Sequence, residues 1–258
     1  MIILGAPVGD YCTDCPYIEG NSFRSENLLI REIDSEGLDY LLSLGFRHFG
    51  EHFFRPICTS CHQCIPIRVG TGGFRLSRNF KRLLAKTRGI RYEISPPEPS
   101  VEKYQLFLNH NRRFRQLDSA GYESFRTSFF HPFPFSRELR LYHGNTLIGI
   151  SHFEWTERSL SAVYCYWDSG AAPFSPGTLA ILKELEIAAE RSIDYVYLGY
   201  YVSSNHHMNY KVRFRPNELL LTEDKWVPFI GEDGTPGTEN AENHGFVPRC
   251  KILWDRET

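Results

Sequence analysis

Residues 138–167 read ELRLYHGNTLIGISHFEWTERSLSAVYCYW, and this stretch decides the fold. Two segments rich in apolar residues, within Glu138 to Trp155, are separated by the turn residues His143-Gly144-Asn145. That pattern is typical of two strands joined by a tight turn. A third predicted strand follows from Leu160 to Trp167, after a polar turn at Glu157-Arg158. The stretch therefore predicts three consecutive strands.

A helix and a further strand are predicted next. Ser175 is suited to cap this helix, and Pro176 suits the first helical position, where its missing N–H costs nothing. Four apolar residues predict the buried face of the helix: Leu179, Leu182, Leu185 and Ala189. A strand from Asp194 to Val202 then leads into the polar run 203–211 and a last helix. This order of elements is that of an acetyltransferase-like (GNAT) mixed sheet, so the predicted fold class is α+β.

The segment Ser95-Pro96-Pro97-Glu98-Pro99 opposes helix formation, because three prolines in five positions fix φ and remove N–H donors. We expect a domain boundary there. Residues 1–95 would form a smaller N-terminal domain that is cysteine-rich and basic, and residues 100–258 would form the acetyltransferase-like catalytic domain. Ser100 can cap the first helix of the second domain, whose shared apolar face we expect to be Val101, Tyr104, Phe107 and Leu108.

Composition excludes two classes of protein. The chain has 258 residues, 41% of them apolar, and its formal net charge is −2. These values are ordinary for a globular protein, and no stretch approaches the roughly 18 apolar residues that a membrane helix needs. A disordered protein and a membrane protein are therefore excluded. The first residues carry no basic n-region, so we expect no export and a cytoplasmic location.

Five of the seven cysteines lie at two places in the first quarter of the chain: Cys12, Cys15, Cys58, Cys61 and Cys64. An odd total in a reducing compartment argues against a disulfide framework. Two Cys-x-x-Cys elements can present four thiolates to one ion, so the spacing predicts zinc or an iron–sulfur cluster. Which of the last three cysteines would join the first pair stays open, and His62 could replace one of them. Reduced, metal-free cysteines are the alternative.

Positive charge is concentrated in one segment. From His52 to Tyr92 the sequence has no acidic residue and nine basic ones. Such a local excess attracts phosphate groups, so nucleic acid is a candidate partner, although a solvated charged face is the alternative. Within this segment we expect four residues to contact RNA: Arg75, Arg78, Lys81 and Arg82.

Several motifs are absent from the sequence. There is no Walker loop, dinucleotide fingerprint, Gly-x-Ser-x-Gly elbow or His-Glu-x-x-His pair. Nucleotide hydrolysis, hydride transfer, serine hydrolysis and zinc proteolysis therefore have no support, and no nucleotide cofactor is expected. The predicted helix after the third strand has only Gly177 where acyl-CoA enzymes carry a glycine-rich turn, which disfavours an ordinary CoA site. Its free amides, at Gly177 and Thr178, could still receive a phosphate.

An ordered set of short motifs resembles the aminoacyl-tRNA–protein transferases, the arginyl and bacterial leucyl enzymes that extend protein N-termini. In the first half the motifs are 15–17 (CPY), 45–47 (GFR), 54–58 (FRPIC), 66–69 (PIRV) and the basic run 74–82. In the second half they are 147–149 (LIG), 161–164 (SAVY), 177–178 (GT), 197–201 (YLGYY), 208–211 (MNYK) and 214–216 (FRP). The resemblance covers most of the chain.

The resemblance implies a reaction. An amino acid, most simply leucine, would pass from aminoacyl-tRNA to the N-terminal amine of proteins that begin with Asp or Glu, marking them for N-degron degradation. The chain departs from the family pattern at Trp167-Asp168-Ser169, at Pro176 and at His207. An arginyl donor in the same reaction is one alternative. A small-molecule N-acetyltransferase and a catalytically silent RNA-binding protein are the others.

The resemblance also implies roles for particular residues. Lys211, with Arg213 and Arg215 beside it, would pair with the acidic side chain of the acceptor. Asp168 would receive or steer the proton of the attacking amine. The tyrosines expected near the same strand ends are Tyr164, Tyr200 and Tyr201. Without the resemblance, core aromatic residues and a surface lysine are the simpler interpretation.

Overall fold

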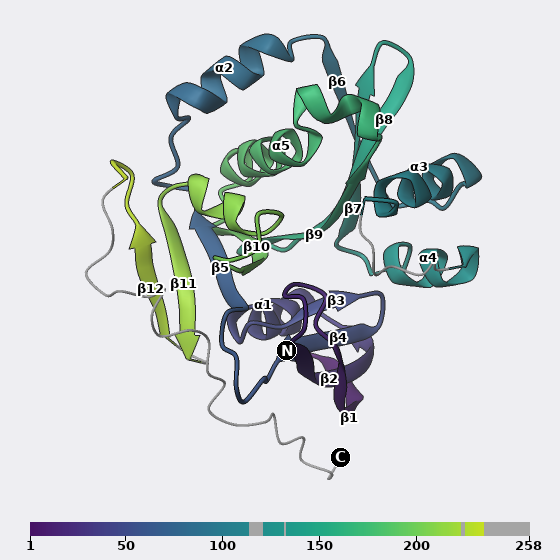
Figure 1. The fold of residues 1–258 in the computed structure, drawn as a ribbon, viewed down its shortest axis with the longest axis vertical. Coiled ribbons are helices and arrows are strands. Elements are labelled where there is room, and N and C mark those ends of the chain that lie inside the picture. The colour runs from purple at the N-terminus through teal and green to yellow at the C-terminus, as the bar shows by residue number, and fades with distance from the viewer. Residues whose placement is uncertain (114–120, 132, 223–224, 235–258) are drawn as a thin grey trace. The chain divides into compact units, whose positions relative to one another are not determined.

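The computed structural model describes residues 1–113, 121–131, 133–222 and 225–234 (Figure 1). The chain divides into two compact units. Unit 1 contains Met1–Phe74 and Tyr197–Thr258, and unit 2 contains Arg75–Val196. Both helices and antiparallel sheets are present, so the predicted α+β class is confirmed. Among the described helices, none has the length and apolar character needed to cross a membrane.

The described part of unit 1 contains two groups of strands and one α-helix. The first group is a four-stranded antiparallel sheet in the order β1 (Ile3–Asp14), β2 (Ser22–Ile33), β4 (His52–Pro56) and β3 (Arg47–Phe49). The second group runs in the order β12 (Lys225–Ile230), β11 (Asn217–Thr222), β5 (Ile65–Gly70) and β10 (Tyr195–Tyr201). The helical segments are α1 (Ser35–Ser43) and the 3₁₀ turn η2 (Asn209–Arg213).

A buried ion pair joins two strands of the first sheet. Arg55 on β4 is fully buried, and its Nε donates to Glu26 Oε2 on β2 at 2.7 Å. The guanidinium also lies 4.7 Å from the centre of the Phe46 ring. A buried charge is tolerated only when it is paired and hydrogen-bonded, so this contact fixes β4 on β2.

Unit 2 is built on an antiparallel sheet in the order β9 (Ser159–Trp167), β8 (Thr146–Trp155), β7 (Ser136–His143) and β6 (Ile90–Ser95). The helix α5 (Pro176–Glu190) lies on one face of this sheet (Figure 1). The helices α3 (Val101–Asn111) and α4 (Tyr122–Phe129) lie on the other. The remaining segments are α2 (Arg78–Lys86) and the 3₁₀ turn η1 (Ser169–Phe174).

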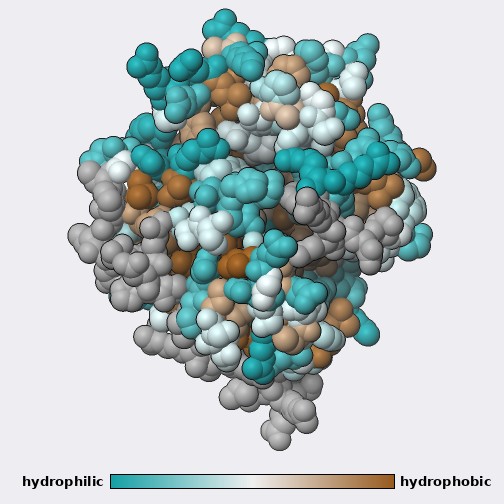
Figure 2. Space-filling model, viewed as in Figure 1, coloured by the Kyte–Doolittle hydropathy of each residue, from teal (hydrophilic) through white to brown (hydrophobic). Residues whose placement is uncertain are grey.

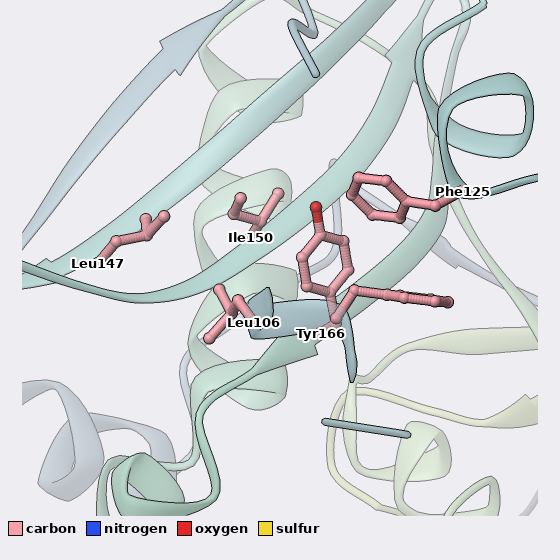
Figure 3. Packing of buried hydrophobic residues seen from close by; sticks show 6 residues of the cluster. Leu106, Phe125, Leu147, Ile150 and Tyr166 are labelled. Atoms are coloured by element: carbon pink, nitrogen blue, oxygen red, sulfur yellow. The ribbon is translucent and has the colours of Figure 1, made fainter. Parts of the chain in front are cut away.

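Aromatic and aliphatic side chains fill the space between the sheet and α3 and α4. The Tyr166 ring lies between Ile150 and Phe125 in Figure 3, and the Tyr166 and Phe125 ring centres are 6.1 Å apart. The cluster is completed by Leu106, Phe107 and Leu147. Burying each such side chain stabilises the fold by about 1.5–3 kcal/mol, so this cluster anchors the two helices.

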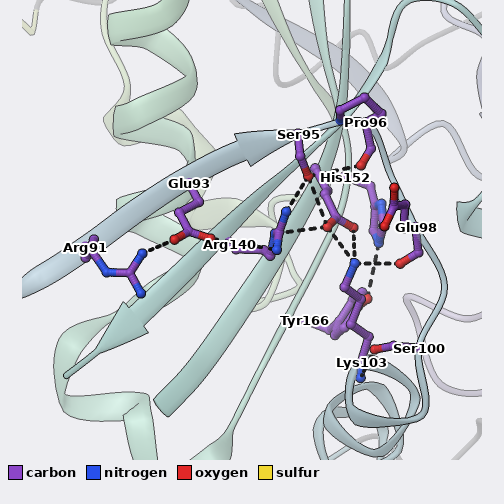
Figure 4. Close-up of polar contacts among 11 residues, drawn as sticks. Arg91, Glu93, Ser95, Pro96, Glu98, Ser100, Lys103, Arg140, His152 and Tyr166 are labelled. Carbon is purple, nitrogen blue, oxygen red and sulfur yellow. Dashed lines mark hydrogen bonds and ion pairs between the residues drawn. The ribbon is translucent and has the colours of Figure 1, made fainter. Parts of the chain in front are cut away.

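A charged network ties α3 to the sheet of unit 2 (Figure 4). Lys103 Nζ lies 2.6 and 2.8 Å from the two carboxylate oxygens of Glu138, whose side chain is fully buried. Arg140 Nε approaches the same carboxylate at 3.1 Å. Nearby, burial lowers the pKa of His152 from 6.5 to about 3, so this histidine is neutral at neutral pH.

Most predicted elements of the second half are confirmed. The turn at residues 143–145 joins β7 to β8, with Gly144 at φ +60°, and β9, α5 and β10 form where expected. Ser100 caps α3 by accepting a hydrogen bond from the Lys103 N–H. Ser175 is the N-cap residue of α5 and Pro176 is its first residue, as predicted, but Ser175 is left-handed (φ 52°) and its side chain makes no cap bond. The predicted helix faces are wrong at Val101 and Ala189, which are exposed.

The proline-rich segment 95–99 lies inside unit 2, between β6 and α3. The two compact units divide the chain at other points, after Phe74 and after Val196. The basic segment is divided accordingly, since α2 belongs to unit 2 while the five cysteines near the N-terminus belong to unit 1. The domain boundary at residues 95–100 stays a prediction.

The Lys103–Glu138 pair yields a stability prediction. Lys103→Met should lower the free energy of unfolding by about 3 kcal/mol, because the buried carboxylate loses its closest cation. Arg126→Met is the control, since its pair with Glu123 is exposed and should change stability by less than about 1 kcal/mol. Urea unfolding followed by circular dichroism measures both. Equal effects of the two substitutions would contradict a stabilising role for the buried pair.

Candidate active site

Lys211 lies in η2 of unit 1 and is 9% exposed. Its Nζ donates to the backbone oxygen of Tyr200 at 2.8 Å and lies 3.8 Å from Met208 Sδ. Burial, together with the nearby charge of Arg47, lowers the pKa of Lys211 from 10.5 to about 7. The interpretation of Lys211 as a surface cation is therefore wrong. A lysine with this pKa can release or accept a proton near neutral pH.

Gly199, one residue before Tyr200 on β10, lies beside this lysine. Its φ of +82° lies in the left-handed region that favours glycine. A β-carbon at this position would lie 3.4 Å from Arg47 Nε and 3.6 Å from Lys211 Nζ. Two cationic side chains therefore converge on the space that a side chain would fill. Arg47 is not among the predicted site residues, although it belongs to the 45–47 motif.

The two predicted site tyrosines of β10, Tyr200 and Tyr201, are both buried. The Tyr200 hydroxyl donates to the backbone oxygens of Gly45 and Phe54, at 3.1 and 3.3 Å. Burial raises the pKa of Tyr200 well above 10, so the phenol remains neutral. The Tyr201 ring packs 5.6 Å from Phe229, centre to centre. Tyr200 thus helps to position β10 beside β4, and Tyr201 packs in the core.

Two further arginines predicted for the acceptor site lie near Lys211 in sequence. Arg213 is exposed, and its Nε donates to the Tyr210 backbone oxygen at 3.2 Å. Arg215 is half-buried, and among the described residues its Nε has no hydrogen-bond acceptor. In the described part of the chain, no hydrogen bond or ion pair joins either arginine to Lys211. The structure thus brings Arg47 rather than these two residues to the lysine.

Four of the five predicted metal-ligating cysteines are neighbours in unit 1. Burial raises the pKa of Cys64, and the nearby thiols of Cys15, Cys58 and Cys61 raise it further. The Arg24 N–H also donates to Cys58 Sγ at 3.3 Å. Cys12 is exposed and faces Arg24 across the β1–β2 pairing. Within the described ranges, no group of three or more His, Cys, Asp or Glu side chains is arranged to hold a metal ion.

In unit 2, the predicted residue Tyr164 lies within β9, and Asp168 lies just beyond the end of that strand. The Tyr164 hydroxyl donates to Asn111 Oδ1 at 3.3 Å, and burial raises its pKa to about 12. Asp168 Oδ1 accepts from the Gly170 N–H at 2.7 Å and caps η1. The Arg113 guanidinium lies 4.0 Å from the centre of the Trp167 ring. Tyr164 is therefore a neutral hydrogen-bond donor, while Asp168 is partly accessible.

The first turn of α5 offers fewer free amides than predicted. Pro176 has no N–H, and the N–H groups of Thr178 and Leu179 both donate to the Ser175 oxygen, at 2.9 and 3.0 Å. Among the described groups of this turn, the Gly177 N–H is the one left for a ligand. A phosphate at this helix end would therefore accept a hydrogen bond from the Gly177 N–H rather than from the Thr178 N–H.

The basic helix α2 presents its charges to solvent. All four predicted RNA-contacting residues are exposed, and Phe80 is the one buried side chain of the helix. Hydrophilic side chains gather over α2 at the upper left of Figure 2. Further exposed cations on or just after the helix are Lys86, Arg88 and Arg91. Such a surface can bind a polyanion without base readout.

Known proteins resemble this chain in sequence and in fold. Residues 13–82 match the family model described as arginine-tRNA-protein transferase, N terminus, and residues 102–221 match the corresponding C terminus. An aspartate/glutamate leucyltransferase of Helicobacter hepaticus is 34% identical, over 80% of this chain and 88% of its own length. Another, of Stutzerimonas stutzeri, is 35% identical over 72% and 80%. The crystal structure of FemX matches with a TM-score of 0.50 at 10% identity, covering 82% of this chain and 86% of that chain.

The structure is a mixed α+β fold, and its candidate site contains buried and charged side chains. The sequence matches are more specific than the fold, since they span both units and most of the length of the relatives. The chain belongs to the aminoacyl-tRNA–protein transferase family and is therefore an aminoacyltransferase. The resemblance deduced from short motifs is thereby confirmed.

Proposed function

We propose that the protein transfers leucine from aminoacyl-tRNA to the N-terminal amine of proteins that begin with Asp or Glu, which marks them for N-degron degradation. Relatives that are 32–35% identical are named aspartate/glutamate leucyltransferases, which supports this donor and these acceptors. The structural observation that supports acceptors with an acidic first residue is the buried Lys211, which lies beside Arg47 in unit 1. A buried cation beside a half-buried one favours an acidic side chain over a neutral one.

The reaction needs little chemistry from the protein, because the donor ester is already activated. The acceptor nitrogen forms a bond to the ester carbonyl carbon, and the bond from that carbon to the 3′ oxygen of the terminal adenosine breaks. A proton leaves the nitrogen, and one is taken up by the released 3′ oxygen. The protein must orient the substrates, which is worth roughly 7–11 kcal/mol, and stabilise the developing negative charge. No attacking side chain is required.

Residues of each unit suit particular parts of this reaction. Lys211 has a pKa near 7 and therefore suits either pairing with the acidic acceptor or exchanging a proton. Asp168 is our candidate for receiving the proton of the amine, and the neutral Tyr164 is a candidate donor to developing negative charge. Tyr200 and Tyr201 position the strand next to Lys211. We interpret the sheet of unit 2 with α5 as acetyltransferase-like, and the protein as cytoplasmic.

Arginine is the second candidate donor. The two family models that match the chain are those of arginine-tRNA-protein transferase, and this observation favours an arginyl donor. The same site would serve either donor, because the ester and the acceptor are unchanged. The identity of the charged tRNA in the transfer assay decides between them.

Transfer from separately charged leucyl- and arginyl-tRNA tests the proposal, with peptides that differ only at residue one. Leucine should reach peptides that begin with Asp or Glu at least tenfold faster than those that begin with Asn or Gln. Lys211→Met should reduce this transfer by at least 100-fold, because the buried cation is lost, while tRNA binding persists. Lys225→Met, an exposed lysine of the same unit, is the control. Absence of label on every peptide would refute the proposal.

The exposed cations of α2 are proposed to bind the tRNA backbone. The triple substitution Arg78→Gln, Lys81→Gln, Arg82→Gln should weaken tRNA binding and reduce the slope of log affinity against log salt by about 2–3, because each duplex phosphate contact contributes about 0.9. Arg126→Gln, which removes an exposed arginine of α4, should leave the slope unchanged. Filter binding between about 50 and 200 mM salt measures this slope. An unchanged slope in the triple variant would exclude α2 from the RNA contact.

We also propose that zinc or an iron–sulfur cluster is held by Cys15, Cys58, Cys61 and Cys64. The support is their mutual proximity and the N–H donor on Cys58, which suits a thiolate. Such a group would fix the loop between β4 and β5, and no step of the reaction is assigned to it.

Elemental analysis of anaerobically purified protein tests the metal proposal. Cys15→Ser should lower the bound metal several-fold, because a ligand is lost. Cys12→Ser should retain it, since Cys12 is exposed on β1, outside the group of four. Wild-type protein without metal, or equal loss in both variants, would contradict this ligand set.

A further inference from the structure

An aromatic ring and a guanidinium are stacked on each other at the end of β9 in unit 2. Trp167 is the last residue of this strand and is partly exposed. The Arg113 Cζ lies 4.0 Å from the centre of the Trp167 ring, and Arg113 is itself exposed. The chain departs from the family pattern at this tryptophan. A guanidinium on an indole forms a flat, cationic surface on which a further planar group can stack.

Two neighbouring elements hold the tryptophan in place. On α3, His110 Nδ1 accepts a hydrogen bond from the Trp167 N–H at 3.1 Å, and the His110 ring meets the indole edge-on, with the ring centres 5.4 Å apart. On β8, Gly149 pairs with Trp167. A β-carbon on Gly149 would lie 3.2 Å from Trp167 Cβ, so a side chain there would displace the tryptophan. The indole therefore has little freedom to lose when a ligand stacks on it.

The first turn of α5 lies next to the same tryptophan. The β-carbon position on Gly149 is also 3.5 Å from Cβ of Pro176, the first residue of α5. One residue later comes the Gly177 N–H, the amide left for a ligand among the described groups of that turn. An amide suited to a phosphate and a stacked pair suited to a planar ring are therefore neighbours. A nucleotide carries both of these groups.

The basic helix α2 reaches the same end of the sheet of unit 2. From its last turn, Lys86 Nζ donates to the Pro173 backbone oxygen at 3.0 Å. Pro173 belongs to η1, whose six residues begin two positions after Trp167. Because a 3₁₀ turn rises about 2 Å per residue, this contact lies within roughly 15 Å of Trp167. A polynucleotide bound along α2 can therefore reach the Trp167–Arg113 pair with its single-stranded end.

We propose that the Trp167–Arg113 pair stacks on the unpaired terminal base of the tRNA 3′ end. This inference rests on the proposed function, in which that end carries the ester. Unpaired bases at RNA ends are recognised by stacking on aromatic rings and on guanidinium planes, whereas the bases of a duplex stay stacked on one another. The ester is attached to the terminal ribose, so a fixed base also limits the positions that the ester can take.

Equilibrium binding of two uncharged tRNAs to the full-length protein tests the inference without catalysis. One tRNA is intact, and the other has an abasic 3′-terminal nucleotide, which keeps the ribose and the phosphate. The wild type should bind the intact tRNA at least about fivefold more tightly, which is the lower end expected for one stacked base. Trp167→Leu should reduce this ratio to less than about twofold. The slope of log affinity against log salt should not change, because a base carries no charge.

Trp155→Leu is the matched control. Trp155 is a second partly exposed tryptophan of unit 2, at the end of β8, and the Arg191 Cζ lies 3.7 Å from its ring centre. It pairs with Leu160 near the turn between β8 and β9, whereas Trp167 lies at the opposite end of this strand pair. The control variant should therefore keep the wild-type ratio of the two affinities.

Several results would overturn the inference. They are a wild type that binds both tRNAs equally, a Trp167→Leu variant that keeps the wild-type ratio, and one that weakens both tRNAs by the same factor. If Trp167→Leu fails to fold by circular dichroism, Arg113→Gln replaces it and should reduce the ratio at least about twofold, because half of the stacked pair is lost. An unchanged ratio in that variant would overturn the inference equally.

Leucine transfer by the wild type is measured separately. Transfer together with an unchanged ratio in Trp167→Leu refutes the base contact alone. A ratio that depends on Trp167, found without transfer to any peptide, refutes the proposed function alone.

Discussion

The candidate site depends on one constraint, which is the burial of the Lys211 ammonium away from water. A buried lysine is costly unless it is neutral, paired or hydrogen-bonded, and this one rests on the backbone oxygen of Tyr200. Gly199 beside this oxygen has the left-handed backbone (φ +82°) that favours glycine, and Tyr200 is itself fixed through hydrogen bonds to Gly45 and Phe54. The position of the Lys211 charge is thus determined by β10, by Gly199 on that strand and by β4 together.

The two units carry different parts of the chemistry. Unit 1 holds the buried Lys211, the half-buried Arg47 and the group of four cysteines. Unit 2 holds an antiparallel sheet, covered by helices on both faces, with the exposed cations of α2 and the polar end of β9. Buried charge gives discrimination between small ligands, whereas exposed charge gives salt-dependent attraction to a polyanion. Under the proposed function, recognition of the acceptor and recognition of RNA would fall to groups that differ in burial.

Local patterns predicted much of the second half of the chain. Turn residues and alternating apolar residues located β7, β8 and β9, and proline at the first helical position located α5. The cap position at Ser175 was located too, but its left-handed backbone, which ends the preceding 3₁₀ turn and leaves its side chain without a cap bond, has no simple sequence signal. Arg47 was missed because its role arises from contact with residues about 150 positions later. Burial of Lys211 was missed for the same reason, since it depends on packing between distant segments.

A titration of Lys211 tests the central claim most directly. In protein labelled with ¹³C at the lysine ε-carbon, the Lys211 signal is assigned by comparison with Lys211→Arg and followed from about pH 5 to 11. The account predicts a midpoint near 7, because burial and the neighbouring Arg47 disfavour the charged form. A midpoint close to the ordinary lysine value of 10.5 would contradict it, since the ammonium would then be hydrated or already paired with an anion of the protein.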